Sequence, residues 1–143
     1  MNVGQECSRP AVTVALNATL AEAAMLMRER NVGAVIVTQS PSDRPTAVGV
    51  ITDRDIVRAQ LDHTADLSSL GVEQAMSRDP LEINAQSDID DAICRMRARG
   101  VRRAPVISAD GTLIGVVSID DLIARVAEDL IGLSAALAKQ AHV

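Results

Sequence analysis

Two hydrophobic patterns, short apolar runs and apolar residues three or four positions apart, alternate along this chain of 143 residues. An extended piece, Ala11–Val14, comes first, and Thr19 then begins a capping-box sequence, TLAE, at the start of a helix. The apolar positions of that helix are Leu20, Ala23, Ala24 and Met27. Two strands, Ala34–Thr38 and Ala47–Ile51, and a helix near Arg54–Leu61 complete a β-α-β-β-α unit.

The same order of elements follows a second time. An extended piece, Pro80–Ile83, precedes a segment with helical spacing. The apolar positions of that segment are Ile89, Ala92, Ile93 and Met96. Two further strands, Ala104–Ile107 and Leu113–Val117, lead into a last helix that begins near Asp120.

The two units are copies of one sequence. Moving the chain by 69 positions places Val3–Thr38 on Val72–Ile107 without a gap, and an offset of 66 then places Asp55 on Asp121. A unit of about 60 to 70 residues buries only about 60% of its unfolded surface and is marginal alone. We therefore expect an α+β fold in which two β-α-β-β-α repeats pack about a pseudo-twofold axis.

The expected domains follow the repeat. The first repeat covers residues 1–62, a polar and patternless linker covers 63–71, and the second repeat with a C-terminal helical extension covers 72–143. The extension carries an apolar stripe made of Leu122, Val126, Leu130, Leu133 and Leu137. A stripe that runs past its own unit needs a surface to cover it. We expect that surface to be a second copy of the chain, giving a homodimer, rather than another part of the same chain.

Composition narrows the classes of partner. A net charge of −5 and a pI of about 4.9 disfavour nucleic acid. No apolar run approaches the roughly 18 residues of a membrane span, and the N-terminus lacks the features of a signal peptide. We therefore expect a cytoplasmic protein with neither nucleic acid nor membrane as a partner.

Cysteine, histidine and aromatic residues are scarce. Cys7 and Cys94 are too few for a disulfide framework, and with His63 and His142 they form no spaced cluster for a metal. Both cysteines align with methionines in the other repeat, so both are expected to pack as small apolar residues. The chain has no Phe, Tyr or Trp, so aliphatic side chains and peptide groups must hold any bound ring.

The strand-to-helix junction of each repeat carries the pattern Ser/Thr-x-x-Asp, as TDRD at Thr52–Asp55 and as SIDD at Ser118–Asp121. In one interpretation the hydroxyl only caps the helix, and the acid is stabilised by the helix dipole. In the other, the helix N-terminus and the hydroxyl bind a phosphate, and the carboxylate accepts both hydroxyls of a ribose. The stretch Arg102–Val106 favours binding, because its proline leaves peptide groups unpaired beside apolar side chains, where they can read an adenine edge.

The duplicated unit resembles the tandem CBS domain, the cystathionine β-synthase module also called a Bateman module, in its small stand-alone bacterial form. The stretches GVITDRDIV and RARGVRRAPVIS…GTLIGVVSIDDLI carry this likeness, which covers nearly the whole chain. The resemblance implies adenosyl ligands (AMP, ADP, ATP, NAD(H) or S-adenosylmethionine) in two clefts between the repeats. It also implies a dimer shaped as a flat disc of four units.

In that family the acid of the junction holds the ribose and the hydroxyl residue faces the phosphate. The resemblance therefore implies a first cleft with Asp55 and Thr52, and a second cleft with Asp121 and Ser118. It also implies that the aligned strand segments read the purine. With the arginine that follows the first junction, the expected ligand-binding residues are Thr13, Ala34, Val35, Ile36, Thr52, Arg54, Asp55, Val101, Arg103, Ala104, Pro105, Ser118 and Asp121.

The two copies also depart from each other. Ile36 stands where the second copy has Pro105, and Glu82 stands where the first copy has Thr13, which places an extra negative charge near the second cleft. Several arginines crowd the second copy, and Arg103 is either part of a solvated face or a contact for a ligand phosphate.

Two functions follow from these patterns. The first is a regulatory module in which nucleotide binding changes how the repeats sit and an effector protein reads the change. The alternative is a dimeric interaction scaffold with empty clefts. An enzyme is not expected, because no nucleophile, base and orienting group can be assembled from these residues.

Overall fold

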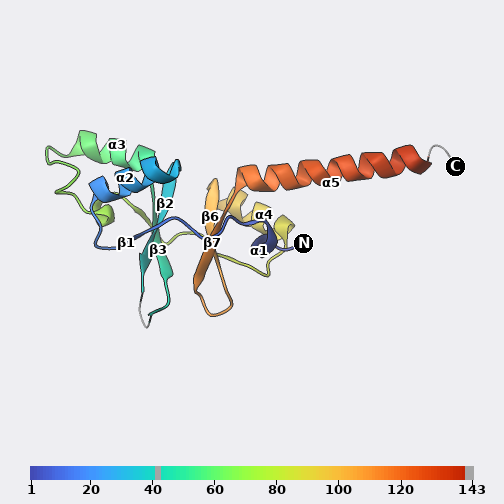
Figure 1. Cartoon of the computed structure of the whole chain (residues 1–143), viewed down its shortest axis with the longest axis horizontal. Helices are drawn as coiled ribbons and strands as arrows, with labels where there is room; N and C mark the ends of the chain where they lie inside the picture. The colour runs from blue at the N-terminus through green and yellow to red at the C-terminus, as the bar shows by residue number, and fades with distance from the viewer. Residues whose placement is uncertain (41–42, 141–143) are drawn as a thin grey trace.

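The chain folds into two α/β units that lie side by side, with one long helix projecting beyond them (Figure 1). The computed structural model describes residues 1–40 and 43–140. The elements of the first unit are β1 (Thr13–Ala15), α2 (Leu20–Arg30), β2 (Ala34–Gln39), β3 (Thr46–Thr52) and α3 (Asp53–Asp62). Those of the second unit are β5 (Ile83–Asn84), α4 (Ile89–Arg99), β6 (Arg103–Ile107), β7 (Leu113–Ser118) and α5 (Ile119–Gln140). The expected α+β fold with an extended C-terminal helix is confirmed.

The strands of the two units pair in the same way. In the first unit β1 runs parallel to β2 and β2 runs antiparallel to β3, and the order β5, β6, β7 repeats this arrangement in the second. Even the irregularity of the hairpin is repeated, because the register shifts between Val37 and Thr38 and between Val106 and Ile107. The sequence repeat is therefore a structural repeat.

The first residues of each repeat pack on the other unit. The elements there are α1 (Val3–Glu6) in the first repeat, and η2 (Val72–Gln74) and β4 (Ser77–Arg78) in the second. β4 extends the sheet of β3, and Ser8 forms a bridge to Val116 of β7. In Figure 1 the chain accordingly starts beside β7 and α5 and crosses to the other unit before β1. Each half thus completes its sheet with a segment from its partner half.

The two equivalent glycines make this crossing feasible. A β-carbon on Gly49 would lie 2.6 Å from the sulfur of Met76 and 2.9 Å from the carbonyl oxygen of Ser77. Gly115 meets the segment Cys7–Arg9 in the same way. Glycine is needed at both places because a neighbouring backbone passes too close for any side chain.

Each unit has its own aliphatic core, and the cores also contain the crossing segments. Val72 and Met76 belong to the core of the first unit, and Val3 belongs to that of the second. A smaller cluster of Ile36, Ala47 and Leu113 joins the two sheets.

The connection at 63–71 contributes to the first core through Leu70, whose carbonyl accepts a bond of 2.8 Å from the amide of Leu20. The repeats are therefore joined by buried contacts as well as by the chain. The domain boundaries expected from the sequence repeat stay a prediction.

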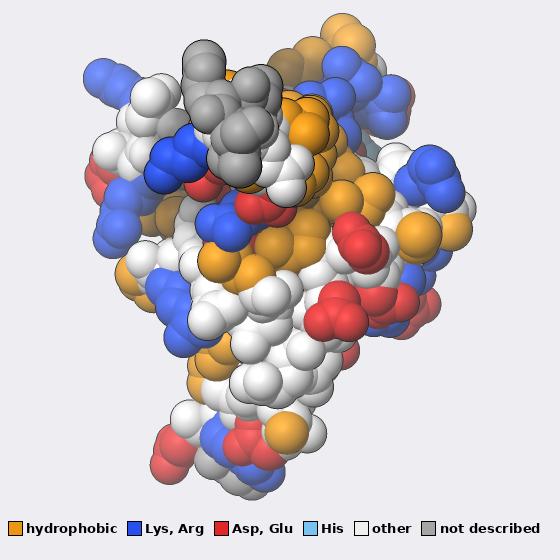
Figure 2. Space-filling view, turned by 90° about the vertical axis from the view of Figure 1, so that its right-hand side faces the viewer, with side chains coloured by type: hydrophobic (Ala, Val, Ile, Leu, Met, Phe, Trp, Pro, Cys, Tyr) orange, Lys and Arg blue, Asp and Glu red, His pale blue; other side chains and the backbone are white. Residues whose placement is uncertain are grey.

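Helix α5 leaves the body of the protein after its first turns. Leu122 is 1% exposed, whereas Leu130, Leu133 and Leu137 are 62%, 64% and 67% exposed. Figure 2 looks toward the projecting end of this helix and shows hydrophobic side chains gathered below and beside it. Leu122 thus packs in the core of its own chain, whereas the stripe from Leu130 to Leu137 stays exposed. Within the described ranges, no helix is both long and apolar enough to cross a membrane.

The two cysteines differ in their surroundings. Cys7 is partly buried and packs against the second core, as expected. Cys94 is exposed, so the expectation that it packs was wrong. Its equivalent, Met25, is also exposed, at 62%, because this face of α2 and of α4 is turned to solvent. His142 lies outside the described residues.

Candidate functional site

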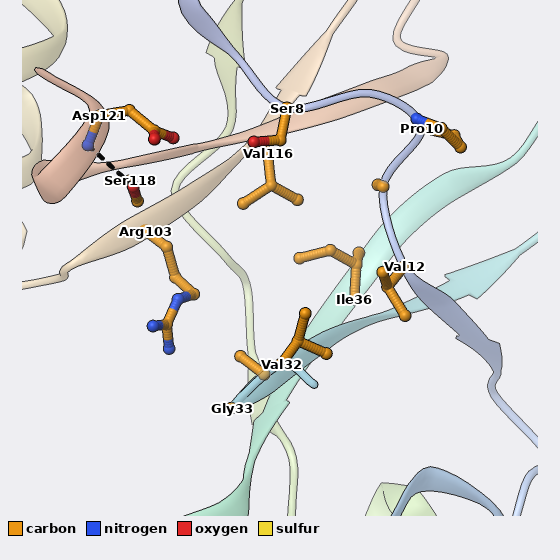
Figure 3. A pocket seen from close by; sticks show the side chains of 12 residues that line it. Ser8, Pro10, Val12, Val32, Gly33, Ile36, Arg103, Val116, Ser118 and Asp121 are labelled. Atoms are coloured by element: carbon orange, nitrogen blue, oxygen red, sulfur yellow. Dashed lines mark hydrogen bonds between the residues drawn. The ribbon is translucent and has the colours of Figure 1, made fainter. Parts of the chain in front are cut away.

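A cavity of about 310 Å³ lies between the two units. Its walls come from both repeats and from the N-terminal crossing segment (Figure 3). The apolar part of the lining consists of Pro10, Ala11, Val12, Val32, Ala34, Ile36 and Val116, with Gly33 between Val32 and Ala34. The polar part consists of Ser8, Arg103, Ser118 and Asp121.

Strand geometry explains why these side chains meet. Side chains two apart share one face of a strand, so Val116 and Ser118 line the cavity from β7 and Ala34 and Ile36 line it from β2. Arg103 is the register partner of Ser118 on the neighbouring strand β6. The alternate residues of β2 face away from the cavity, into the first core.

The junction between β7 and α5 places a carboxylate at the cavity. The Asp121 amide donates a bond of 3.1 Å to the Ser118 hydroxyl, which is an N-cap bond for α5. The carboxylate of Asp121 is half-buried and accepts no hydrogen bond from any residue that the structure describes. Figure 3 shows this bond as a dashed line, and it shows the Asp121 side chain among the residues that line the cavity.

Arg103 supplies a cation to the same cavity. Its side chain extends from β6 toward the segment of Val32 and Gly33 (Figure 3). Among the residues of the described ranges it has neither a salt bridge nor a side-chain hydrogen bond. Its neighbour Arg102, in contrast, lies 3.5 Å from a carboxylate oxygen of Asp120, out in solvent. The cavity thus holds one carboxylate and one guanidinium, and neither is neutralised by a direct contact.

The equivalent junction of the first repeat forms both hydrogen bonds of a capping box. The Asp55 amide donates to the Thr52 hydroxyl at 3.1 Å, and the Thr52 amide donates back to the Asp55 carboxylate at 2.9 Å. Asp55 lines a different depression, together with Arg58 and His63. Both hydrogen bonds of the capping interpretation are therefore present at this junction.

The expected ligand-binding residues fall into two groups. The cavity is lined by Ala34, Ile36, Arg103, Ser118 and Asp121. The others lie elsewhere: Val35 and Ala104 are buried in the cores, Pro105 is buried in β6, Val101 packs on the second core, Thr13 is exposed on β1, and Thr52, Arg54 and Asp55 are at the start of α3. The ligand-binding roles of all of them stay a prediction.

Several lining residues were missed from the sequence. The alternation of β7 was a usable signal for Val116, because it lies two residues before Ser118. Nothing local signals Ser8 and Val12, because the crossing of the N-terminal segment brings them to the cavity. Glu82 does not line the cavity but a separate depression beside Arg78 and Arg99, so its charge does not act where it was expected.

Metal binding has no support from side-chain positions. In the part of the chain that the structure describes, no group of three or more His, Cys, Asp or Glu side chains is placed to hold a metal ion.

The fold and the cavity can be compared with known proteins. The family model of the CBS domain matches residues 3–62 and again 72–128. An uncharacterised 17.7 kDa protein of Acidianus ambivalens is 37% identical over 120 residues, which cover 84% of this chain and 70% of that protein.

Solved structures of CBS-domain proteins share the fold of this chain. A putative signal-transduction protein with CBS domains from Burkholderia ambifaria is 27% identical with a TM-score of 0.77, covering 90% of this chain and 96% of that one. The CBS domain pair of MJ0100, solved with 5′-methylthioadenosine and S-adenosyl-L-methionine, is 22% identical with a TM-score of 0.74 and shares the fold, covering 88% and 98%. This chain therefore belongs to the CBS domain family, as a CBS-domain pair, which is a regulatory module.

Proposed function

We propose that this chain is a sensor that binds an adenosine-type ligand in the cavity of Asp121 and reports the bound state to an effector protein. The observation that carries the proposal is the cavity itself. It combines aliphatic walls with a free carboxylate, a hydroxyl and a free guanidinium, between two repeats.

The carboxylate suits a ribose. Asp121 accepts no bond from the described part of the protein, so both of its oxygens are free to accept the two hydroxyls of a vicinal diol. Such charge-assisted bonds are short and strong, particularly in a half-buried site. A sugar diol is therefore the group best matched to Asp121.

The positive charge of Arg103 suits a phosphate. The Arg103 guanidinium reaches into the cavity, and the Ser118 hydroxyl can still donate its proton while it accepts from the Asp121 amide. The N-terminus of the 22-residue helix α5 adds positive potential at the same place. One guanidinium and one helix terminus fit one phosphate group.

The apolar walls suit a purine. No aromatic side chain exists in the chain, so the ring faces must rest on residues such as Val12, Ile36 and Val116. The two molecules seen with MJ0100, 5′-methylthioadenosine and S-adenosyl-L-methionine, both contain adenosine. A volume of about 310 Å³ is at the small end for ligand pockets, which run from about 300 to 1,000 Å³. We therefore expect a mononucleotide such as AMP to bind more tightly than ATP or NAD(H).

Binding at this place can transmit a signal. Ser118 and Asp121 belong to the second repeat and Ala34 and Ile36 to the first, so one ligand contacts both halves. A ligand that prefers one arrangement of the halves shifts the protein toward that arrangement. No catalytic group is needed for such a function.

Calorimetric titration with AMP tests the proposal. Asp121→Asn should weaken AMP binding by about tenfold or more, because a neutral amide loses the charge-assisted bonds to the diol. Asp120→Asn is the matched control, because Asp120 is on the same helical turn but exposed and outside the cavity. A wild-type protein that releases no heat with AMP, or equal losses in the two variants, would contradict the proposal.

A dimeric scaffold remains the second candidate, and the exposed stripe of α5 favours it. Leu130, Leu133 and Leu137 are more than half exposed on a helix that leaves the body of the protein. We propose that a second copy of the chain covers this stripe. Sedimentation at several concentrations, with and without AMP, separates a scaffold that dimerises without ligand from a sensor whose assembly follows the ligand.

A further inference from the structure

The two junctions have the same sequence pattern but different hydrogen bonding. In the first repeat the Asp55 carboxylate accepts the Thr52 amide at 2.9 Å. In the second repeat the corresponding bond to Asp121 is missing among the described residues, and only the hydroxyl cap at 3.1 Å is formed. The duplicated pattern therefore produces one engaged carboxylate and one free carboxylate.

The surroundings of the two carboxylates differ as well. Asp121 lines the cavity between the units, together with strand residues of both repeats. Asp55 lines a depression whose other residues are Arg58, Ala59, Asp62, His63, Gln74 and Ala75. None of these comes from the strands, whereas strand residues of both repeats line the cavity of Asp121.

From these differences we infer that each chain binds a single nucleotide, in the cavity of Asp121, and that the junction of Asp55 is a structural helix cap. The inference rests on the proposed function and adds two points: how many nucleotides one chain binds, and which of the two junctions binds them. Asp55 offers a diol only one unengaged oxygen, because its Oδ2 already accepts the half-buried Thr52 amide, whereas Asp121 offers two. A diol at Asp55 would therefore compete with the cap bond for one oxygen, which favours Asp121 as the binding carboxylate.

A matched pair of substitutions tests which of the two junctions binds the nucleotide. Val116 and Val50 are equivalent in the repeat, are both half-buried, and pack on the same small cluster between the sheets. Val116 lines the cavity, whereas Val50 does not. Val116→Phe should fill the cavity and weaken AMP binding by about tenfold or more, and Val50→Phe should leave the affinity close to that of the wild type. The reverse result would overturn the inference.

Calorimetry with AMP on the full chain tests the stoichiometry. We expect close to one AMP per chain in the wild type, and no site of wild-type affinity in Asp121→Asn. Two AMP per chain, or a site of wild-type affinity remaining in Asp121→Asn, would overturn the single-site inference while leaving the proposed function intact. A wild type that takes up no AMP contradicts the proposed function instead. Circular dichroism and melting curves identify any variant that fails to fold, and the wild-type stoichiometry then decides alone.

Discussion

Gly115 lies directly against the backbone of Ser8. A β-carbon on Gly115 would be 2.5 Å from the Ser8 carbonyl oxygen, well inside contact distance. The same oxygen accepts a bond of 3.0 Å from the Val116 amide, and the Ser8 amide donates to the Val116 carbonyl at 2.9 Å. Residues more than a hundred positions apart therefore form one edge of the second sheet, and Ser8 reaches the cavity through this contact.

Gly115→Ala should lower the free energy of unfolding by about 1–3 kcal/mol, because the added methyl overlaps the carbonyl oxygen of Ser8, a residue held in place by two backbone hydrogen bonds to Val116. Gly132→Ala is the matched control, since nothing lies within 4 Å of a β-carbon there and it sits inside helix α5. That change should stabilise the protein by about 0.5–1 kcal/mol. Urea unfolding measures both, and a neutral effect of Gly115→Ala would show that the crossing strand can move aside.

Asp55→Asn and Asp121→Asn should differ in stability. The Asp55 carboxylate accepts the Thr52 amide in the first turn of α3, so its neutralisation weakens both this bond and the interaction with the helix dipole and should lower the free energy of unfolding by about 0.5–2 kcal/mol. The Asp121 carboxylate accepts no bond from the described residues, so its replacement removes only the interaction with the helix dipole, about 0.3–1 kcal/mol. Thermal and urea unfolding without ligand give both values. A larger loss for Asp121→Asn would contradict the assignment of roles.

Acid should weaken the contact between the two hairpin loops. Hydrogen bonds from Ser108, then Thr112, and then from Arg44 of the other repeat hold the pKa of Asp110 well below its usual 3.8. A depressed pKa in the folded state contributes stability that is fully present above the unfolded value and is lost as the pH falls below it. The difference in unfolding free energy between wild type and Asp110→Asn should therefore shrink as the pH is lowered from 5 through about 4 and below. A difference that does not change with pH would exclude this contribution.

Leu130→Glu should prevent the proposed dimer. Leu130 is 62% exposed in the middle of the stripe, and a second copy that covers it would bury the new charge without a partner. We expect the dissociation constant of the dimer to rise by about tenfold or more. Ala135→Glu adds the same charge on the opposite, polar side of the same projecting helix and should have little effect. Sedimentation equilibrium measures the constants, and a monomeric wild type would contradict the dimer itself.

Much of the architecture follows from the sequence alone. Apolar periodicity predicts each main helix and strand, because one face of every element must be buried, and the offset of 69 between Val3 and Val72 shows the duplication. The cap bonds of Thr52 and Ser118 also follow, because they join residues three apart.

Only the tertiary structure decided which of the two acids is free. Asp55 and Asp121 share one local pattern, and the difference lies in a side-chain bond and in the walls around each. The crossing of Ser8 to β7 was equally hidden, because a two-residue bridge leaves no periodicity to detect. Local patterns report which face of an element is buried, whereas a site between two repeats depends on contacts between residues far apart in the chain, which no single stretch records.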